Sequence, residues 1–268
     1  MVSLRIHSLR MAASKKEILC QLQKEILPLQ GFRPLAAGSV VDMGLGPIQA
    51  AFPNGSFPTG AVHELISQTV EEAAASWGFM AALASPLMRK GGVCIWVSYG
   101  RTLFPPALQR FGIKPDQVLF IDVKRERDVL WTIEEALKCE GLGAVVGEVR
   151  EIDLTASRRL QLAVEQSRVT GFLFRHQPRN ADPIASITRW RIKPLSSELE
   201  DLLPGVGFPR WDVELLKIRN GRPGRWRVEW NAGEFRIIRP EIDLIGGVLD
   251  AVSGEIASTD PVERRKTG

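Results

Sequence analysis

Residues 60–74 read GAVHELISQTVEEAA, and they join a strand pattern to a helix pattern. The apolar run that ends at Ile66 is typical of a buried strand, and the acidic, alanine-rich run from Glu71 is typical of a helix N-terminus. In α/β proteins that hydrolyse nucleotides, the turn between such a strand and helix is a glycine-rich loop that holds phosphate. Here the turn has two glutamates and no lysine. The fold and the phosphate chemistry are therefore separate questions.

Strand and helix patterns alternate after this turn. A helix predicted over residues 71–88 is followed by apolar strand patterns of about five residues, separated from one another by amphipathic helix patterns. This alternation predicts an α/β fold in which helices cover both faces of a mostly parallel sheet. The strand patterns are GVCIWVS (92–98), QVLFIDV (117–123), LGAVVGEV (142–149) and GFLFRH (171–176).

Beyond Pro183 only strand patterns remain. Their polar and apolar residues alternate, which predicts antiparallel strands with one solvent-exposed face at the C-terminal end of the sheet. The turns RNGRPGRW and NAGEF are typical of hairpins. Tryptophans in such patterns are expected to pack in the sheet rather than to stack on nucleic-acid bases. The four patterns are SITRWRI (186–192), WDVELLKIR (211–219), WRVEWNA (226–232) and EFRII (234–238), with Trp190, Trp226 and Trp230 among them.

A short amphipathic helix is predicted ahead of this core. Ser14 and Glu17 form a capping-box pattern, and Ile18, Leu22 and Ile26 fall on one stripe. Such a helix has to bury its stripe, either on its own domain or on a neighbouring subunit, and both arrangements remain open. We therefore expect an N-terminal helix and linker (1–35), a core (36–240) and a C-terminal tail (241–268).

Composition and length place the chain among cytoplasmic globular proteins. Its 268 residues are 44% hydrophobic and 25% charged, which suits one large α/β domain with short appendages. No apolar run approaches the ~18 residues of a membrane span, and the N-terminus lacks the apolar core of a signal peptide. Cys20, Cys94 and Cys139 lie far apart, which favours free thiols in a reducing compartment over a disulfide or metal set.

Positive charge is concentrated in the C-terminal half. Between Arg168 and Arg239 the chain has 14 Lys and Arg and 8 Asp and Glu, a local net charge of +6, while the rest of the chain sums to −2. This asymmetry favours a polyanion or an acidic protein as a partner. A solvated strand face rich in arginine would give the same pattern, so both interpretations stay open.

The phosphate-loop pattern G-x-x-x-x-G-K-[ST] is absent from residues 67–74. Ser67 and Glu72 replace its glycines, and Ala73 and Ala74 replace its lysine and its magnesium-binding hydroxyl residue. Thr69 with Glu72 instead forms a capping box, which would occupy the N–H groups that a phosphate needs. Two acids in the first helical turn would also repel a triphosphate. We expect no ATP hydrolysis at this turn.

No other catalytic, cofactor or metal site is predicted. His7, His63 and His176 have no serine or cysteine partner in a recognisable motif, and no metal-ligand spacing occurs. Glu148 ends a strand pattern at the place where phosphate-loop ATPases hold magnesium. Without a lysine or threonine opposite, it is interpreted as a relic or a structural hydrogen-bonding residue.

The order of these patterns resembles the RecA recombinase core over roughly residues 40–238. GSFPTGAVHELI leads into the first strand, FRHQP ends a later strand, and residues 211–237 resemble the closing sheet extension. The resemblance places Gly100 where RecA proteins have the glutamate that activates water. Gln177 matches the glutamine that leads into the second DNA-binding loop. The loops PRNADP and REIDLTASRR are much shorter than the two RecA DNA-binding loops.

A RecA-like core with altered phosphate motifs and short loops resembles the ImuA family, and the stretches FPTGAVHEL, LGAVVGEV and ASRRLQLAVEQSRVTGFLFR carry this resemblance. ImuA proteins are accessory factors related to RecA and SulA. The resemblance implies a non-catalytic adaptor in the mutasome of the SOS response, which acts with the polymerase-like ImuB and a DnaE2-type polymerase in error-prone translesion synthesis. Alternatives are a SulA-type cell-division inhibitor, for which the antiparallel ending is too long, and a DNA-stimulated ATPase with an atypical nucleotide site.

The adaptor hypothesis names two candidate surfaces. The stripe of Ile18, Leu22 and Ile26 would bind a protein partner, because an N-terminal helix docks on the neighbouring core in RecA-type filaments. A homo-oligomer is therefore left open. Weak, salt-sensitive contact with the phosphates of single-stranded DNA is expected from four arginines near the short second loop, Arg175, Arg179, Arg189 and Arg191.

Overall fold

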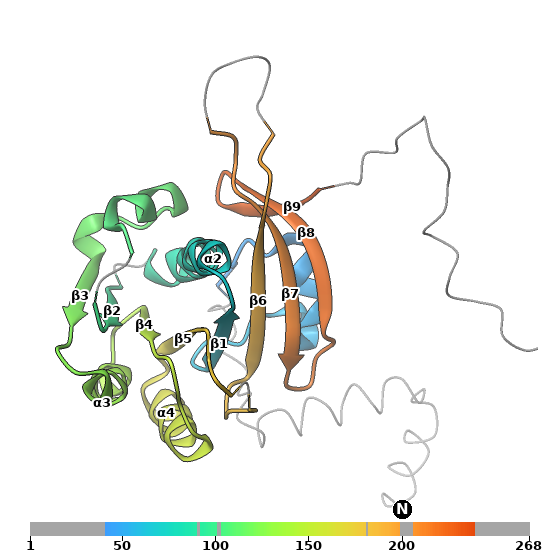
Figure 1. Ribbon diagram of the computed structural model, residues 1–268. Coiled ribbons are helices and arrows are strands. Elements are labelled where there is room, and N and C mark those ends of the chain that lie inside the picture. Colours follow the sequence, from blue (N-terminus) through green and yellow to red (C-terminus); the bar gives the residue numbers. More distant parts are fainter. Residues whose placement is uncertain (1–40, 90–91, 101–102, 181, 199–205, 239–268) are drawn as a thin grey trace, which may run out of the picture. The chain divides into compact units, whose positions relative to one another are not determined.

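The computed structural model describes residues 41–238 except 90–91, 101–102, 181 and 199–205 (Figure 1). The predicted N-terminal helix with Ile18, Leu22 and Ile26 lies outside the described residues, as does the tail after Pro240. The predicted domain boundaries therefore stay predictions. Within the described ranges, no helix is both long enough and apolar enough to cross a membrane.

The described residues form one nine-stranded sheet with the order β3-β2-β4-β5-β1-β6-β7-β8-β9 (Figure 1). Every neighbouring pair from β3 to β6 is parallel, and every pair from β6 to β9 is antiparallel. The predicted α/β class, with a mostly parallel sheet and antiparallel strands at the C-terminal end, is confirmed. The strands are β1 Val62–Ser67, β2 Cys94–Ser98, β3 Val118–Asp122, β4 Ala144–Glu148, β5 Thr170–His176, β6 Thr188–Leu195, β7 Arg210–Ile218, β8 Gly224–Asn231 and β9 Glu234–Ile237.

Helices cover both faces of the parallel part of the sheet (Figure 1). Helix α2, Val70–Met88, packs its many small and apolar residues against one face, where Leu65, Phe172 and Trp190 are buried. Helices α3, Glu126–Lys138, and α4, Leu154–Ser167, pack on the other face. Because α2 is buried along most of its length, it lacks the polar stripe of a surface helix. Short 3-10 helices complete the described chain: η1 Gly46–Ala51, η2 Pro53–Gly55, η3 Pro105–Phe111 and η4 Pro115–Gln117.

Strand β6 corrects one part of the sequence prediction. Residues 186–192 were expected in a purely antiparallel strand, but β6 pairs parallel with β1 and antiparallel only with β7. The chain leaves the end of β5, where the Gln177 N–H donates to the Ser67 carbonyl, and returns to the start of β1, where the Ile187 N–H donates to the Val62 carbonyl. Alternation along a strand predicts which face each side chain occupies but not the direction of the neighbouring strand.

Residues 41–57, which we call the strap, pack against the β9 edge of the sheet on the same side as α2. The Phe235 N–H of β9 donates to the Gly44 carbonyl, and the Arg222 N–H donates to the Ala51 carbonyl. Gly46 has φ +51°, and a Cβ there would overlap the Phe235 carbonyl. Only glycine therefore allows the strap to approach β9 so closely.

The carboxyl edge of the sheet as candidate functional site

In parallel α/β sheets, ligands bind at the carboxyl ends of the strands. Here β1 ends at Ser67 and α2 begins at Val70, so only Gln68 and Thr69 connect them. This connection is too short to form the glycine-rich cradle that wraps around a phosphate. The N-terminus of α2 is therefore the place to ask whether a nucleotide could bind.

Side chains of the protein occupy the first turn of α2. The Glu72 N–H donates to Thr69 Oγ1 at 3.2 Å, and the Gln68 N–H donates to Glu72 Oε2 at 2.8 Å. The predicted capping arrangement of Thr69 and Glu72 is thus confirmed. It differs in one detail, because the Glu72 carboxylate accepts from Gln68 and not from the N-cap residue itself. Two donors that could have faced a phosphate are already bonded.

Arg191 of β6 holds the other oxygen of the same carboxylate. Its Nε and Nη2 donate to Glu72 Oε1 at 3.1 and 2.8 Å, and Glu72 is buried. The charge of Glu72 is therefore balanced within the fold, which corrects the expectation that both acids would repel a triphosphate. Glu71 is exposed, and a hydrogen bond with the Thr69 side chain lowers its pKa, so its negative charge persists beside the helix end.

The end of β5 is tied to the same turn. Gln177, in the left-handed region with φ +47°, donates from its side-chain amide to the Gln68 carbonyl at 3.1 Å. Ser67 Oγ lies 2.9 Å from His176 Nδ1. Gln177, the position that matches the RecA glutamine, here joins β5 to the β1–α2 turn.

The next strands along this edge also pair their polar groups with each other. Trp96 Nε1 donates to Glu148 Oε1 at 2.7 Å, and Ser98 Oγ donates to Asp122 Oδ1 at 3.0 Å. Burial raises the pKa of Glu148, the Trp96 hydrogen bond opposes this, and the charge of Asp122 adds to the rise. Glu148 thus makes a structural hydrogen bond, one of the two roles that the sequence analysis left open for it. Among the described residues, no group of three or more His, Cys, Asp and Glu side chains could hold a metal ion.

A second carboxylate lies buried on the α4 side of β1. Glu64 is fully buried; Arg175 Nη1 donates to its Oε1 at 2.8 Å, and Arg189 Nε donates to its Oε2 at 2.7 Å. The two arginines also donate to the carbonyls of Asn180 and Asp182 in the β5–β6 connection. The sequence analysis missed this cluster. A glutamate at the centre of the apolar run GAVHELI was the signal, because a buried charge requires a partner.

Comparison with known proteins adds the decisive observation. No family model matches the chain. Protein ImuA of Caulobacter vibrioides, in the strains NA1000 / CB15N and ATCC 19089 / CIP 103742 / CB 15, is 36% identical to it over 199 residues, which cover 70% of this chain and 82% of the relative.

The chain belongs to the ImuA family.

The four arginines predicted to bind DNA have different environments in this ImuA-family chain. Arg175 is 1% exposed and held by Glu64, so its predicted contact with DNA is corrected to a role inside the fold. Arg189 is largely buried against Glu64, and Arg191 is half-buried against Glu72. Arg179 is exposed. Its backbone N–H, not its guanidinium group, donates to Glu151 Oε1 at 2.7 Å. The structure therefore does not bring the four guanidinium groups together on one accessible surface.

The three tryptophans predicted to pack in the C-terminal strands of this ImuA-family chain do so. Trp190 and Trp230 are buried, and Trp226 packs against the same apolar core. Cys94 is buried, and burial raises the pKa of its thiol to about 12, so it is unreactive. Cys139 is exposed and free, and Cys20 lies outside the described residues.

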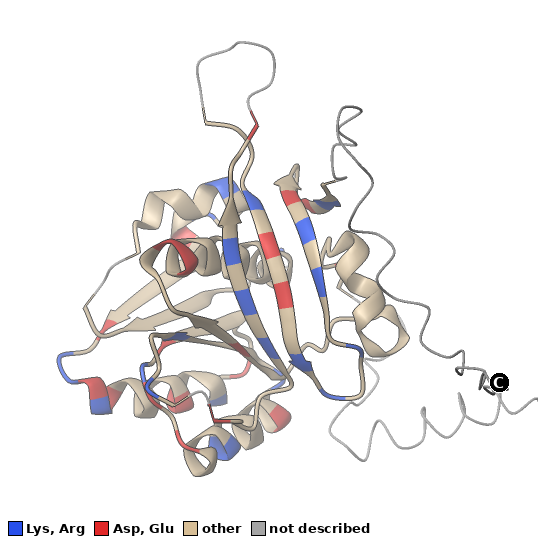
Figure 2. Cartoon of the chain, turned by 45° about the vertical axis from the view of Figure 1, so that its right-hand side comes forward, with Lys and Arg blue, Asp and Glu red and all other residues tan. Residues whose placement is uncertain are grey.

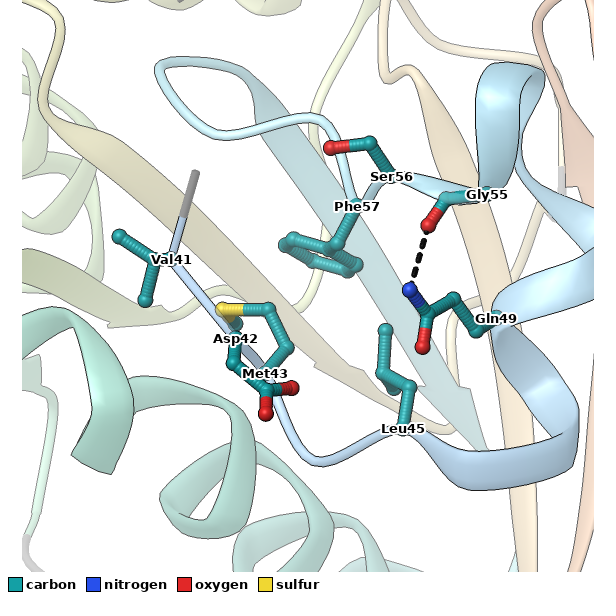
Figure 3. A pocket seen from close by; sticks show the side chains of 8 residues that line it. All are labelled: Val41, Asp42, Met43, Leu45, Gln49, Gly55, Ser56 and Phe57. Atoms are coloured by element: carbon teal, nitrogen blue, oxygen red, sulfur yellow. Dashed lines mark hydrogen bonds between the residues drawn. The ribbon is translucent and has the colours of Figure 1, made fainter. Parts of the chain in front are cut away.

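A small pocket lies away from the carboxyl edge, in the strap that precedes β1 (Figure 3). Its volume is about 120 Å³, and the side-chain amide of Gln49 donates across one wall to the Gly55 carbonyl at 2.7 Å. The pocket is too small for a nucleotide or a drug-sized ligand. It is lined by Val41, Asp42, Met43, Leu45, Gln49, Gly55, Ser56 and Phe57.

Proposed function

We propose that this ImuA-family chain is a non-catalytic, RecA-like accessory protein of error-prone translesion DNA synthesis in the SOS response. It acts in the cytoplasm as an adaptor in a mutasome, with an ImuB-type polymerase-like protein and a DnaE2-type polymerase as partners. The observation that carries the proposal is the occupied N-terminus of α2, where Glu72 bonds to both Thr69 and Arg191 at the place of a nucleotide phosphate. Membership of the ImuA family supports the choice of pathway.

A nucleotide phosphate would have to displace this arrangement. It would need the Gln68 and Glu72 N–H groups, which already donate to Glu72 and Thr69. Freeing them would also separate Glu72 from Arg191 and leave a largely buried carboxylate without its cation, which is costly. Ala73 and Ala74 offer neither an ammonium group nor a magnesium-binding hydroxyl in return. A protein that has a RecA-like fold but cannot bind a nucleotide phosphate at this helix end is suited to an adaptor role.

The catalytic part of the proposal is tested by phosphate release. We expect the full chain, with magnesium and ATP, to release no phosphate above a buffer control, with or without single-stranded DNA. The Glu72→Ala variant should behave in the same way. DNA-stimulated release that this substitution abolishes would overturn the proposal and favour an ATPase with an atypical nucleotide site.

The adaptor part is tested by retention of partners on the immobilised chain. We expect retention of the ImuB-type protein, and loss of retention when Ile18, Leu22 and Ile26 are all changed to alanine. A matched variant with Gln21→Ala and Lys24→Ala, off the predicted stripe, should retain it. Retention of a cell-division tubulin homologue in place of the polymerase partner would contradict the adaptor function.

A further inference from the structure

The small pocket in the strap lies where the described chain begins, and we call it the strap pocket. Val41 and Asp42, the first described residues, are part of its wall, so residues 1–40 reach the core at the rim of this pocket (Figure 3). Its volume is about 120 Å³. An engineered cavity of about 150 Å³ in a protein core holds one small apolar molecule, so the strap pocket suits a single aliphatic side chain.

The inner wall of the strap pocket is apolar. Met43, Leu45 and Phe57 line it, and all three are buried in the larger core. The exposed residues Asp42 and Gln49 line it as well, which gives the pocket a polar rim. Apolar atoms that border an empty space lack contact partners on that side. An aliphatic side chain in the pocket would therefore stabilise the strap.

Contacts within the fold hold this wall in place. Phe57 stacks on His63 with 4.3 Å between ring centroids, and it meets Phe52 edge-on at 5.3 Å. On the opposite wall, the Gln49 side-chain amide donates to the Gly55 carbonyl at 2.7 Å. A cavity whose walls cannot move inward is the kind that costs most when it stays empty. The pocket is thus preformed for an occupant.

The sequence directly ahead of the strap supplies a side chain of the right size. Gly38 followed by Ser39 is a signal for a two-residue turn. A reversal of the chain at these two residues brings Leu35 alongside Asp42, at the rim of the pocket. Leu35 is also the only large aliphatic residue between Arg33 and Ser39.

The other face of β6, β7 and β8 is unsuited to an apolar side chain. Its charges alternate in sign from strand to strand (Figure 2), and they bond across the strands, as in the pairs Arg225 with Asp212 and Arg210 with Glu229. An aliphatic side chain placed there would take these groups out of water without replacing their hydration. The strap side of the sheet therefore suits the N-terminal segment better.

We propose that Leu35 of the same chain occupies the strap pocket and anchors the N-terminal segment to the core. Six residue steps separate Leu35 from Val41, so the leucine stays within about 21 Å of the rim. Such a short tether gives a local concentration on the order of millimolar. This concentration favours the chain's own leucine over that of a second copy.

The anchor restricts where the N-terminal helix can act. Nine residue steps separate Ile26 from Leu35, so the predicted stripe of Ile18, Leu22 and Ile26 ends within about 32 Å of the strap pocket. A partner that binds the stripe is therefore held near the β9 edge of the sheet. This consequence deepens the proposed function and rests on it for the role of the stripe, whereas the anchor itself does not.

The test compares Leu35→Ala with Phe32→Ala in the full chain. Phe32 is another large apolar residue of the same segment, so it controls for loss of apolar surface as such. We expect Leu35→Ala to lower the melting temperature by about 2 to 4 °C and Phe32→Ala to lower it by less than about 1 °C. Equal shifts in the two variants would overturn the proposal.

Hydrogen exchange locates the effect within the chain. Amides of the strap, residues 41–57, should exchange faster in the Leu35→Ala variant than in the unmodified chain, because the strap opens more often without its occupant. The Phe32→Ala variant should leave this exchange unchanged. If strap exchange is the same in both variants, Leu35 does not fill the pocket.

A double-mutant cycle with Met43→Ala tests direct packing. Both substitutions alter the same pocket, so the combined loss of stability should be smaller than the sum of the single losses. Additive losses would mean that Leu35 packs elsewhere, which contradicts the proposal.

Dilution distinguishes the two possible sources of the leucine. If the chain's own Leu35 fills the pocket, the effect of Leu35→Ala on the melting temperature stays constant over an about hundredfold dilution. An effect that disappears on dilution would mean that a second copy supplies the leucine, and the proposal would be wrong. None of these measurements involves retention of the polymerase partner, so their failure is distinguishable from failure of the proposed function.

Discussion

At the scale of the residue, Glu72 connects helix capping with the question of nucleotide binding. Its carboxylate accepts from the Gln68 N–H and from Arg191, and its own N–H caps onto Thr69. The same atoms that stabilise α2 thus occupy the position of a phosphate. The change in unfolding free energy on substitution of Glu72 therefore measures how strongly its side chain occupies the N-terminus of α2.

We predict that Glu72→Ala lowers the free energy of unfolding by about 1 to 3 kcal/mol, since a cap contact and a partly buried ion pair are lost together. The matched variant Glu71→Ala, at an exposed neighbour, should change it by less than about 0.5 kcal/mol. Urea denaturation measures both. Equal effects of the two substitutions would mean that Glu72 does not close the helix end.

His63 forms a hydrogen-bonded chain within the core. Trp190 Nε1 donates to Thr188 Oγ1 at 2.7 Å, that oxygen lies 2.8 Å from His63 Nδ1, and His63 Nε2 lies 2.8 Å from the Pro58 carbonyl. A carbonyl only accepts, so Nε2 carries the proton and Nδ1 accepts from Thr188. Burial lowers the pKa of His63 to about 4 against the opposing effect of the Pro58 hydrogen bond.

This lowered pKa predicts loss of stability in mild acid. The unfolded chain takes up a proton near pH 6.5, the ordinary value, whereas folded His63 resists it until about pH 4. The unfolding free energy should therefore fall as pH decreases through this window, by about 3 kcal/mol from this group. Denaturation of the His63→Gln variant across the same pH range should lack that part of the decline. An unchanged pH profile would contradict the buried neutral tautomer.

At the scale of the element, the β5–β6 connection replaces the helix that usually covers a parallel crossover. Arg175 and Arg189 donate to its carbonyls, Lys217 donates to the Ile184 carbonyl, and Ser157 Oγ accepts from the Ala185 N–H. Glu64 balances the charge of the two arginines. The connection is thus held to the sheet by polar contacts around one carboxylate.

We predict that Glu64→Gln lowers the free energy of unfolding by about 3 to 5 kcal/mol, because two largely buried guanidinium groups would lose their counter-ion. Glu151→Gln is the control: Glu151 lies 3.5 Å from Arg175 but is 42% exposed, so its loss should cost less than about 1 kcal/mol. Limited proteolysis within residues 177–187 should also accelerate in the Glu64 variant. An unchanged cleavage rate would mean that Glu64 does not hold this connection.

At the scale of the whole molecule, a single sheet joins the two apolar cores. The larger core lies between the sheet, α2 and the strap, and the smaller lies beneath α3 and α4. Because β1 and β5 contribute residues to both cores, and β6 joins the larger core to the ion cluster around Glu64 on the α4 side, neither side can unfold without exposing the other. The described residues should therefore behave as one cooperative unit.

We predict that a fragment of residues 36–240 unfolds in one cooperative transition, within a few degrees of the full chain. The two apolar cores of the described residues lie within this fragment, and a change of 1 kcal/mol would shift the melting temperature of a domain of this size by only about 2 to 4 °C. Scanning calorimetry of both proteins checks this. Two transitions in the fragment would contradict the predicted core boundaries.

Local patterns were sufficient for much of this architecture. The strand and helix stretches, the capping pair Thr69 and Glu72, the inward tryptophans and the missing phosphate-loop residues all follow from the chemistry of neighbours in sequence. They could be predicted because side-chain periodicity and capping act over a few residues. Three features were predicted wrongly: the direction of β6, the accessibility of Arg175 and the repulsion of phosphate by Glu72.

The sequence by itself determined the class of fold, the residues that face the core and the absence of a phosphate cradle. Only the tertiary structure decided which charges meet. Glu64 and Arg175 are 111 positions apart, and Glu72 and Arg191 are 119 positions apart. Their pairing depends on β5 and β6 flanking β1 in the sheet. Strand order is set by long-range packing, and no local pattern contains it. Three of the four arginines that suggested a DNA surface in the sequence, Arg175, Arg189 and Arg191, therefore became counter-ions within the fold.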